Sequence, residues 1–350
     1  MSESPLPRRQ LGASGPLVSA ITLGTMNFGE QVDAARAHDL LDTAWSLGIT
    51  SFDTAESYAS PMREATQGAS ERILGHWLQS VPRSEVFIAS KVSGPAAKLH
   101  YLRGGPKLTR DHIEQAVSAS LDRLKTDYLD LYQIHWPARS TNYFGRLGYS
   151  PRDDSGATPI RETLEALAAV VESGRVRHIG VSNETPWGVM HYLALSNEFG
   201  LPRIQSVQNP YNLLSRTLEI GLAEVLHREQ LGLLAYAPLA DGVLSGKYAD
   251  GAVPAGTRLA MWPDYYDRYT LCDTKVVVEG YCQIAQEHNL QPATMALAWL
   301  LAQPGVSTAI IGVSCVQQLL DNVRAARVKL PKALRKAIGA LHARHPNPCP

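Results

Sequence analysis

The chain has few cysteines, no excess of charge of either sign and no motif for holding zinc. Its 350 residues include four cysteines, Cys272, Cys282, Cys315 and Cys349. They form no Cys-x-x-Cys pair and no zinc-ligand spacing, so we expect unpaired, buried thiols in a reducing compartment and no metal site. Lys+Arg and Asp+Glu number 33 each. This balance predicts no basic surface and therefore no nucleic acid or anionic membrane as a partner.

The chain also lacks the apolar segments that target or anchor a protein. Residues 1–9 contain no apolar core of a signal peptide. No run approaches the roughly 18 apolar residues that cross a bilayer. We therefore expect a soluble, cytoplasmic protein with no membrane partner.

A hydrophobic content of 45% is ample for a large core. Short β-branched apolar runs alternate with longer segments whose apolar residues recur at three- and four-residue steps. The predicted strands are residues 19–23, 50–53, 87–91, 129–135, 176–181, 204–208, 232–237 and 308–311. The predicted helices include residues 34–47, 110–124, 163–173, 188–199 and 218–230.

This alternation predicts an α/β fold, a (β/α)8 TIM barrel that forms a single domain over residues 1–350. Residues 1–8 and 343–350 are expected to be flexible tails. An N-terminal β-hairpin around residues 11–18 is expected to cap the barrel floor. A doubly wound sheet is the alternative, but the first strand leads into residues 24–29 (GTMNFG) and not into a phosphate-binding Gly-x-Gly-x-x-Gly.

Two connections are too long for plain turns: residues 136–158 after the fourth strand and residues 238–271 after the seventh. Long ordered loops in a compact domain are usually functional, and a barrel has its site at the C-terminal ends of its strands. We expect both loops to wall that site, although surface insertions that pack on themselves are the alternative. Their aromatic residues are Trp136, Tyr143, Phe144 and Tyr149 in the first, and Trp262, Tyr265, Tyr266 and Tyr269 in the second.

Three consecutive predicted strands end on groups that can do chemistry. Asp53 ends the second strand, Lys91 the third and His135 the fourth, and Tyr58 follows Asp53 in the next loop. Helix capping or rim packing would explain each residue singly. Neighbouring strand ends meet at one rim of a barrel, so the four complementary groups together predict a catalytic site.

The charges in this set suit a proton donor. A phenol with a pKa of about 10 is a poor acid near neutrality. An ammonium about 4 Å away, at an effective dielectric of roughly 20, favours the phenolate by ~4 kcal/mol before desolvation opposes it. We therefore expect Lys91 to lower the pKa of Tyr58, with Asp53 holding Lys91 charged. His135 would hydrogen-bond a substrate carbonyl or share in the proton transfer.

These motifs resemble the aldo-keto reductases over nearly the whole chain. The spacing from Asp53 to Tyr58, the strand-end Lys91 and residues 133–137 (QIHWP) are similar to the family's catalytic tetrad. Residues 64–68, 89–95, 180–185 and 207–211 resemble its Tas-like branch, which is also similar to the β subunits of voltage-gated potassium channels. The resemblance implies a barrel that binds NADPH (NADP+) and reduces a small-molecule aldehyde or ketone, with Tyr58 as the general acid.

The resemblance also implies the residues that contact the cofactor. Thr25 and Met26 follow the first strand, and Asp53 lies near the nicotinamide ribose. Ser182, Asn183 and Gln208 would bind the carboxamide, and Tyr236 would stack under the ring, with core packing as its alternative. Residues along the pyrophosphate would be Ala237, Pro238, Leu239, Ala240, Leu244, Gly246, Lys247 and Arg258. Those at the 2′-phosphate and adenine would be Gly312, Ser314, Gln318, Asp321 and Asn322.

The adenosine end departs from the aldose-reductase pattern, because Gly312 and Gln318 stand where that pattern has basic residues. Hydrogen bonds would then hold the phosphate in place of ion pairs. Two other functions remain open from the residues. One is a redox-sensing regulatory module that binds NADPH and turns over slowly, and the other is a Schiff-base lyase that uses Lys91.

Overall fold

A computed structural model describes residues 6–248, 251–270 and 274–349. Eight parallel strands close into a barrel in the order β10-β3-β4-β5-β6-β7-β8-β9. The closed sheet confirms the predicted (β/α)8 barrel and excludes the doubly wound alternative, whose sheet is open. The strands are β3 (Ile21–Gly24), β4 (Ser51–Asp53), β5 (Phe87–Val92), β6 (Leu129–Ile134), β7 (Val176–Ser182), β8 (Ser206–Pro210), β9 (Gly232–Tyr236) and β10 (Val306–Ile311).

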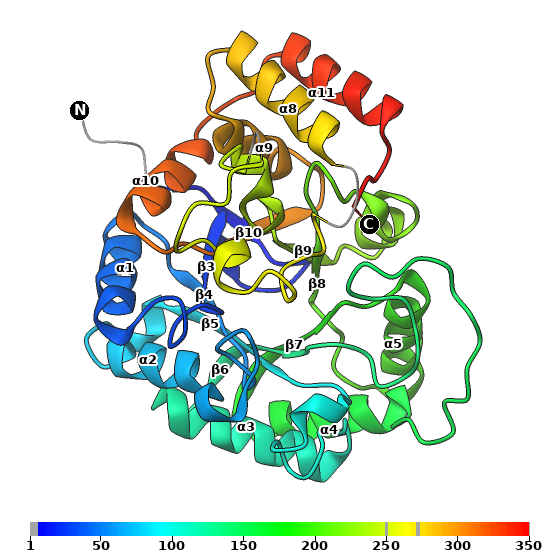
Figure 1. The fold of residues 1–350 in the computed structure, drawn as a ribbon. Helices are drawn as coiled ribbons and strands as arrows, with labels where there is room; N and C mark the ends of the chain where they lie inside the picture. Colours follow the sequence, from blue (N-terminus) through cyan, green and yellow to red (C-terminus); the bar gives the residue numbers. More distant parts are fainter. Residues whose placement is uncertain (1–5, 249–250, 271–273, 350) are drawn as a thin grey trace.

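Helices surround these strands (Figure 1). The first six, each after one strand from β3 to β8, are α1 (Ala34–Ser46), α2 (Ala69–Leu78), α3 (Arg110–Leu124), α4 (Ile160–Glu172), α5 (Pro186–Phe199) and α6 (Leu222–Arg228). The others are α7 (Arg258–Met261), α8 (Lys275–Glu287), α9 (Pro292–Leu301), α10 (Val316–Ala325) and α11 (Lys332–Arg344). The predicted helix 218–230 is divided into a 3-10 turn and α6 at Gly221, whose φ of 138° favours glycine.

The helices bury one face each against the outside of the barrel. On α4 the buried residues include Leu164, Leu167 and Val170, which recur every three residues and so lie on one side of the helix. Helices α2 and α3 approach very closely at Gly75, where an added Cβ would lie 2.3 Å from the backbone oxygen of Arg123. The core is therefore a continuous layer between the strands and the ring of helices.

Inside the barrel, side chains change from apolar at the floor to polar at the mouth. Alternate residues of a strand point to the same side, so Phe87 and Ala89 precede Lys91 on the inner face of β5. The two apolar residues pack with Leu131, Leu234, Ile310 and others in one buried cluster. Because all strands of the barrel run in the same direction, the polar C-terminal ends meet at a single mouth.

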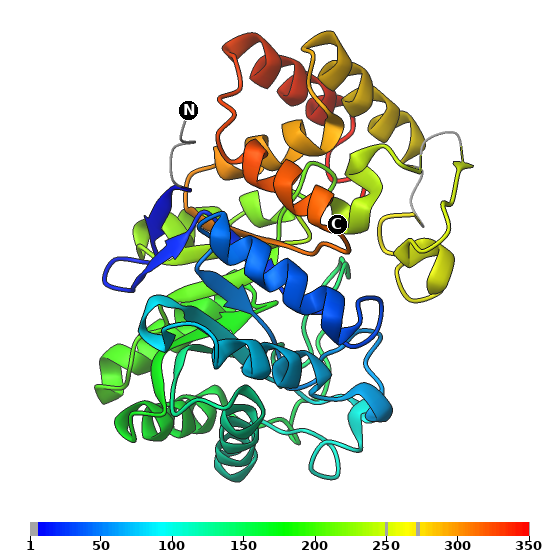
Figure 2. The ribbon, with the colours of Figure 1, turned by 90° about the vertical axis from the view of Figure 1, so that its left-hand side faces the viewer.

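The predicted hairpin is present and closes the floor. β1 (Arg8–Gln10) pairs antiparallel with β2 (Leu17–Ser19). Figure 2 shows the hairpin at one end of the barrel and residues 251–270, in yellow, at the opposite end. Leu11 is fully buried in the floor cluster. The Arg9 guanidinium donates hydrogen bonds to the backbone oxygens of Val306 and Leu301 at 2.9 and 2.8 Å.

The C-terminal segment makes contacts that a flexible tail would not make. The amide of Cys349 donates to the backbone oxygen of Leu214 at 3.1 Å, and Asn347 Oδ1 accepts from the amide of Arg216 at 2.6 Å. At the other end, Leu6 is buried and Arg8 already belongs to β1. Residues 1–5 and 350 of the expected tails lie outside the described residues.

The cysteines match the expectation only in part. Cys282 and Cys315 are unpaired, but Cys282 is half-buried and Cys315 is exposed, whereas Cys349 is buried. Cys272 lies outside the described residues. Among the residues that the structure describes, no helix is long and apolar enough to cross a membrane, and no cluster of three His, Cys, Asp or Glu residues could hold a metal ion.

Candidate active site

The mouth of the barrel holds a buried ion pair. Lys91 Nζ donates to Asp53 Oδ2 at 2.5 Å and to the backbone oxygen of Thr54 at 2.8 Å. Strands β4 and β5 are hydrogen-bonded neighbours, which brings these two strand ends together. Both side chains are almost fully buried. Burial lowers the pKa of Lys91, and the charge of Asp53 opposes this shift.

Tyr58 lies beside this pair, with its Oη 3.4 Å from Lys91 Nζ. The expected lowering of its pKa is not found: burial, and then the charge of Asp53, raise the pKa of Tyr58 well above its ordinary value. The reason is that Asp53 offsets the positive charge of Lys91, so desolvation of the phenolate dominates. The phenol is therefore held in its protonated form, which is the form that a proton donor needs.

A second buried carboxylate holds the loop that carries Tyr58. Glu56 Oε1 accepts from the amide of Ser93 at 2.8 Å. Arg103 donates to both oxygens of Glu56, at 2.6 and 2.8 Å. A bidentate arginine fixes the carboxylate in orientation as well as in position. Sequence reasoning missed this clamp, since Arg103 lies on a distant loop with no pattern that links it to Glu56.

His135 follows β6 and faces Tyr58 edge-on. The two ring centroids are 5.5 Å apart, with an angle of 79° between the ring planes. Burial, and then the charge of Lys91, lower the pKa of His135 well below its ordinary value. The ring is thus a neutral imidazole, which donates a hydrogen bond from one nitrogen only. His135 and Tyr58 both line the same cavity.

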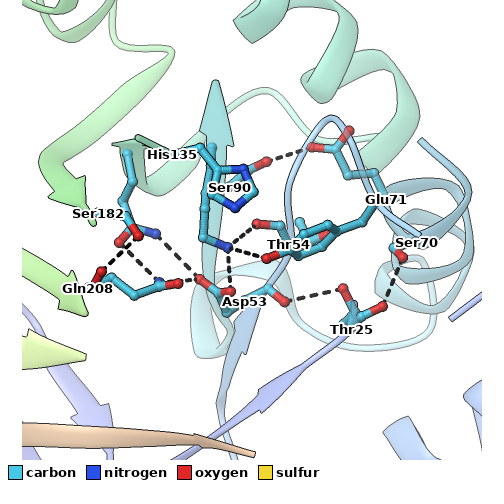
Figure 3. Close-up of polar contacts among 12 residues, drawn as sticks. Thr25, Asp53, Thr54, Ser70, Glu71, Ser90, His135, Ser182 and Gln208 are labelled. Atoms are coloured by element: carbon cyan, nitrogen blue, oxygen red, sulfur yellow. Dashed lines mark hydrogen bonds and ion pairs between the residues drawn. The ribbon is translucent and has the colours of Figure 1, made fainter. Parts of the chain in front are cut away.

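This cavity has a volume of about 980 Å³ and opens at the mouth. Most of the predicted cofactor residues line it: Met26, Asp53, Ser182, Asn183, Gln208, Tyr236, Ala237, Pro238, Leu239, Lys247, Arg258, Gly312, Ser314, Gln318, Asp321 and Asn322. Four predicted residues, Thr25, Ala240, Leu244 and Gly246, are not in its lining. Thr25 is buried and its Oγ1 donates to the backbone oxygen of Asp53 at 3.2 Å, as Figure 3 shows.

One wall of the cavity is a chain of hydrogen bonds between strand ends. Ser182 Oγ donates to the backbone oxygen of Gln208 at 2.7 Å, and Asn183 Nδ2 donates to Ser182 Oγ at 3.1 Å. Tyr236 Oη donates to Asn183 Oδ1 at 2.7 Å. Tyr236 is therefore positioned by a polar contact at the cavity surface, in addition to packing against the apolar cluster below.

Another part of the cavity carries positive charge next to glycine backbone. Lys247 and Arg258 both line it. An added Cβ at Gly312 would lie 2.8 Å from Arg258 Nη2, so the absence of a side chain there lets the guanidinium approach the end of β10. Arg258 Nη1 also pairs with Asp241 Oδ1 at 3.1 Å. Guanidinium and ammonium groups beside open backbone are suited to the phosphates of a dinucleotide.

Both long connections border the cavity, as predicted. Trp136 and Phe144 line it from the first connection. Residues 251–270, which we call the lid, lie across the centre of the ring in Figure 1. From the lid, Tyr265, Tyr266 and Tyr269 line the cavity, whereas Trp262 does not. Tyr143 packs near Trp136, and Tyr149 is 63% exposed.

The lid touches the loop that carries Tyr58. Tyr266 Oη donates to Ser60 Oγ at 3.1 Å, and Ser60 Oγ donates to Tyr265 Oη at 3.3 Å. Sequence reasoning missed Ser60 and several other lining residues, among them Asn27, Met62, Lys98, Asp241 and Arg268. These residues lie in loops or short 3-10 turns, where no periodicity signals which side chains face the site.

Comparison with known proteins accounts for this architecture. The model of the aldo/keto reductase family matches residues 20–342. The chain belongs to the aldo/keto reductase family. Membership implies an oxidoreductase that acts on small-molecule carbonyl compounds, and the family generally uses NAD(P)H.

Relatives within the aldo/keto reductase family cover nearly the whole chain. Protein tas of Escherichia coli (strain K12) is 46% identical over 335 residues, which are 95% of this chain and 96% of that protein. The uncharacterized oxidoreductase YrpG of Bacillus subtilis (strain 168) is 33% identical over 334 residues, 94% of this chain and 93% of that protein. A probable voltage-gated potassium channel subunit beta of Oryza sativa subsp. japonica is 32% identical over 328 residues, 91% of each chain.

Proposed function

We propose that the protein reduces aldehydes or ketones to alcohols with NADPH, and that Tyr58 is the general acid. One observation carries this proposal. The Tyr58 phenol is kept protonated, lies 3.4 Å from the Lys91 ammonium, and faces a cavity that it shares with neutral His135. A proton donor, a cation to stabilise the anion it leaves, and a hydrogen-bond donor for the carbonyl are the groups that this reaction needs.

NADPH supplies a hydride to the carbonyl carbon when it is bound. The residues of the chain supply the rest of the reaction. Tyr58 Oη gives its proton to the carbonyl oxygen as negative charge develops there, so that hydride and proton together yield the alcohol. Lys91 stabilises the resulting phenolate, and Asp53 keeps Lys91 charged inside the barrel. His135 donates an N–H to the carbonyl oxygen and so orients the substrate.

The cavity wall fits the proposed cofactor. Ser182, Asn183 and Gln208 present amide and hydroxyl groups for a carboxamide, and Tyr236 presents a ring on which a nicotinamide stacks. Lys247 and Arg258 would hold phosphates, and Gly312, Ser314, Gln318, Asp321 and Asn322 would surround the adenosine. Thr25, Ala240, Leu244 and Gly246 would support this wall from outside the lining.

A second function is favoured by the similarity to a protein named as a potassium channel subunit beta. A regulatory module would bind NADPH tightly and turn over slowly. It would purify with its cofactor bound and in complex with a partner. Brisk turnover by a protein that purifies without a partner would exclude it.

The test of the proposed reductase is the oxidation of NADPH with an aromatic aldehyde. Tyr58→Phe should lower kcat by about 10²–10⁴ while leaving the Kd for NADPH unchanged, because the proton donor is lost but the binding wall is intact. Tyr132→Phe is the control, since Tyr132 is also a buried tyrosine but its hydroxyl has no hydrogen-bond partner among the described residues. Equal activity of wild type and Tyr58→Phe would show that the mechanism is wrong.

A further inference from the structure

Gln133 is a buried polar residue for which the proposed mechanism has no role. It lies on β6, two residues before His135, and its side chain is 0% exposed. Its neighbours on the same inner face of the barrel are apolar Leu131 on one side and the catalytic layer on the other. An amide in such a place destabilises the fold unless its groups are hydrogen-bonded. Its partners therefore indicate what it does.

The partners of Gln133 are Asp53 and Gln208. Gln133 Nε2 donates to Asp53 Oδ1 in a long contact of 3.4 Å. Gln208 Nε2 donates to the same oxygen at 2.8 Å and to Gln133 Oε1 at 3.2 Å. Figure 3 shows Gln208 beside Asp53, on the side away from Thr54. The two oxygens of Asp53 thus have separate partners, because Lys91 binds Oδ2 and the two glutamines bind Oδ1.

This arrangement fixes which way each amide points. An ionised carboxylate only accepts hydrogen bonds, so Asp53 requires an NH2 group from both glutamines. With its NH2 on Asp53, Gln133 presents its oxygen to Gln208. Gln208 then meets acceptors on two sides and has to direct its own NH2 towards them. Its Oε1 is left as an acceptor on the side of the cavity that Gln208 lines.

We propose that Gln133 is a positioning residue that locks the Gln208 amide with its oxygen towards the cavity, so that this oxygen accepts a hydrogen bond from the NH2 group of a nicotinamide carboxamide. The proposal rests on the proposed use of NADPH. In this arrangement the carboxylate of Asp53 positions two different groups, one through each of its oxygens. Oδ2 holds the lysine beside the proton donor, and Oδ1 sets the acceptor that recognises the cofactor.

The experiment compares two ligands that differ at the recognised group. NADP+ carries a carboxamide, whereas its acetylpyridine analogue has a methyl group in place of the NH2. We would measure Kd for both by the quenching of intrinsic tryptophan fluorescence, without substrate. The wild type should bind NADP+ more tightly than the analogue. Gln133→Met keeps the volume of the side chain. It should raise the Kd for NADP+ by about threefold to tenfold and leave the Kd for the analogue unchanged.

A second variant keeps the test valid if Gln133→Met does not fold. In Gln133→Glu the side chain has the same length, and beside Asp53 it takes up a proton more readily than an ordinary glutamate. When protonated it can donate to Asp53 and accept from Gln208 as the amide does. Because a carboxyl oxygen accepts from Gln208 in either protonation state, this variant should keep the preference for NADP+ over the analogue, and loss of that preference would overturn the positioning role. Gln283→Met, on the exposed side of α8, is the control and should change neither Kd.

The outcomes separate this proposal from the proposed function. If Gln133→Met lost the same affinity for both ligands, or lost affinity for neither, the positioning role of Gln133 would be overturned. A wild type that binds both ligands equally would also overturn it and leave the reductase intact. A wild type that binds neither dinucleotide would overturn the proposed function itself.

Discussion

The barrel mouth and the lid differ in secondary structure and in burial, although they face the same cavity. At the mouth, Asp53, Lys91 and Gln133 come from three neighbouring strands and are buried. The lid contains the four-residue helix α7, and its Tyr265 is 38% exposed. It meets the mouth through tyrosine hydroxyls on Ser60. Asp53, Lys91 and Gln133 therefore lie on regular strands, whereas the cover lies mostly on irregular structure.

This difference sets how much a substitution costs in each region. A group removed at the mouth leaves its partner charged or unsatisfied in a medium of low dielectric. A hydroxyl removed from the lid leaves only a neutral partner, Ser60, which keeps its hydrogen bond to Tyr265. Changes of similar size should therefore have large effects at the mouth and small effects in the lid.

Lys91→Met should have the largest effect, because it removes the buried ion pair at the mouth. It leaves the Asp53 carboxylate buried without its cation, so the free energy of unfolding should fall by about 3–5 kcal/mol, measured by urea denaturation. Lys275→Met is the control, because Lys275 Nζ lies 3.8 Å from Glu279 Oε1 on an exposed helix face and should change stability by less than about 1 kcal/mol. Similar losses in the two variants would contradict the contrast between buried and exposed pairs.

The pH dependence of stability tests whether His135 is buried at the mouth. Its pKa in the folded protein lies well below the ordinary value of 6.5. Below about pH 6.5 the unfolded chain therefore binds a proton that the folded protein does not. As the pH is lowered in this range, the free energy of unfolding decreases by up to ~1.4 kcal/mol per pH unit. The neutral variant His135→Gln should lose less stability than the wild type between neutral and mildly acidic pH. Parallel curves of unfolding free energy against pH would contradict this.

Tyr266→Phe probes the lid and should have the smallest effect. It removes the hydrogen bond to Ser60 Oγ, and burial raises the pKa of Tyr266 to about 12, so the hydroxyl is neutral throughout the working range. We expect the Kd for NADPH to rise by no more than roughly fivefold, or about 1 kcal/mol, with kcat almost unchanged. Tyr149→Phe in the other connection, where the ring is exposed, is the control. A large fall in kcat would mean that the lid takes part in the chemistry.

The same contrast explains what could be predicted from sequence. The strands predicted to end on Asp53, Lys91 and His135 are buried, and each shows in the sequence as a mainly apolar run with a polar residue at or next to its end. The hydrogen bond from Gln208 to Asp53 joins residues that are 155 positions apart, and only the closed register of the barrel brings them together. The direction of the Tyr58 pKa could not be predicted either, because it depends on how far Asp53 offsets Lys91. The lid residues offered no periodic pattern at all.

The closed floor of the barrel limits the route by which Tyr58 can regain a proton. Leu11 and the apolar cluster around it lie below the catalytic layer, so these described residues present apolar side chains and no proton carrier towards the floor. In the proposed mechanism, the phenolate formed at Tyr58 would regain its proton from the mouth. The proposed alcohol product would leave through that same opening. Reprotonation of the enzyme and departure of the product are therefore expected to share one path and to follow each other in time.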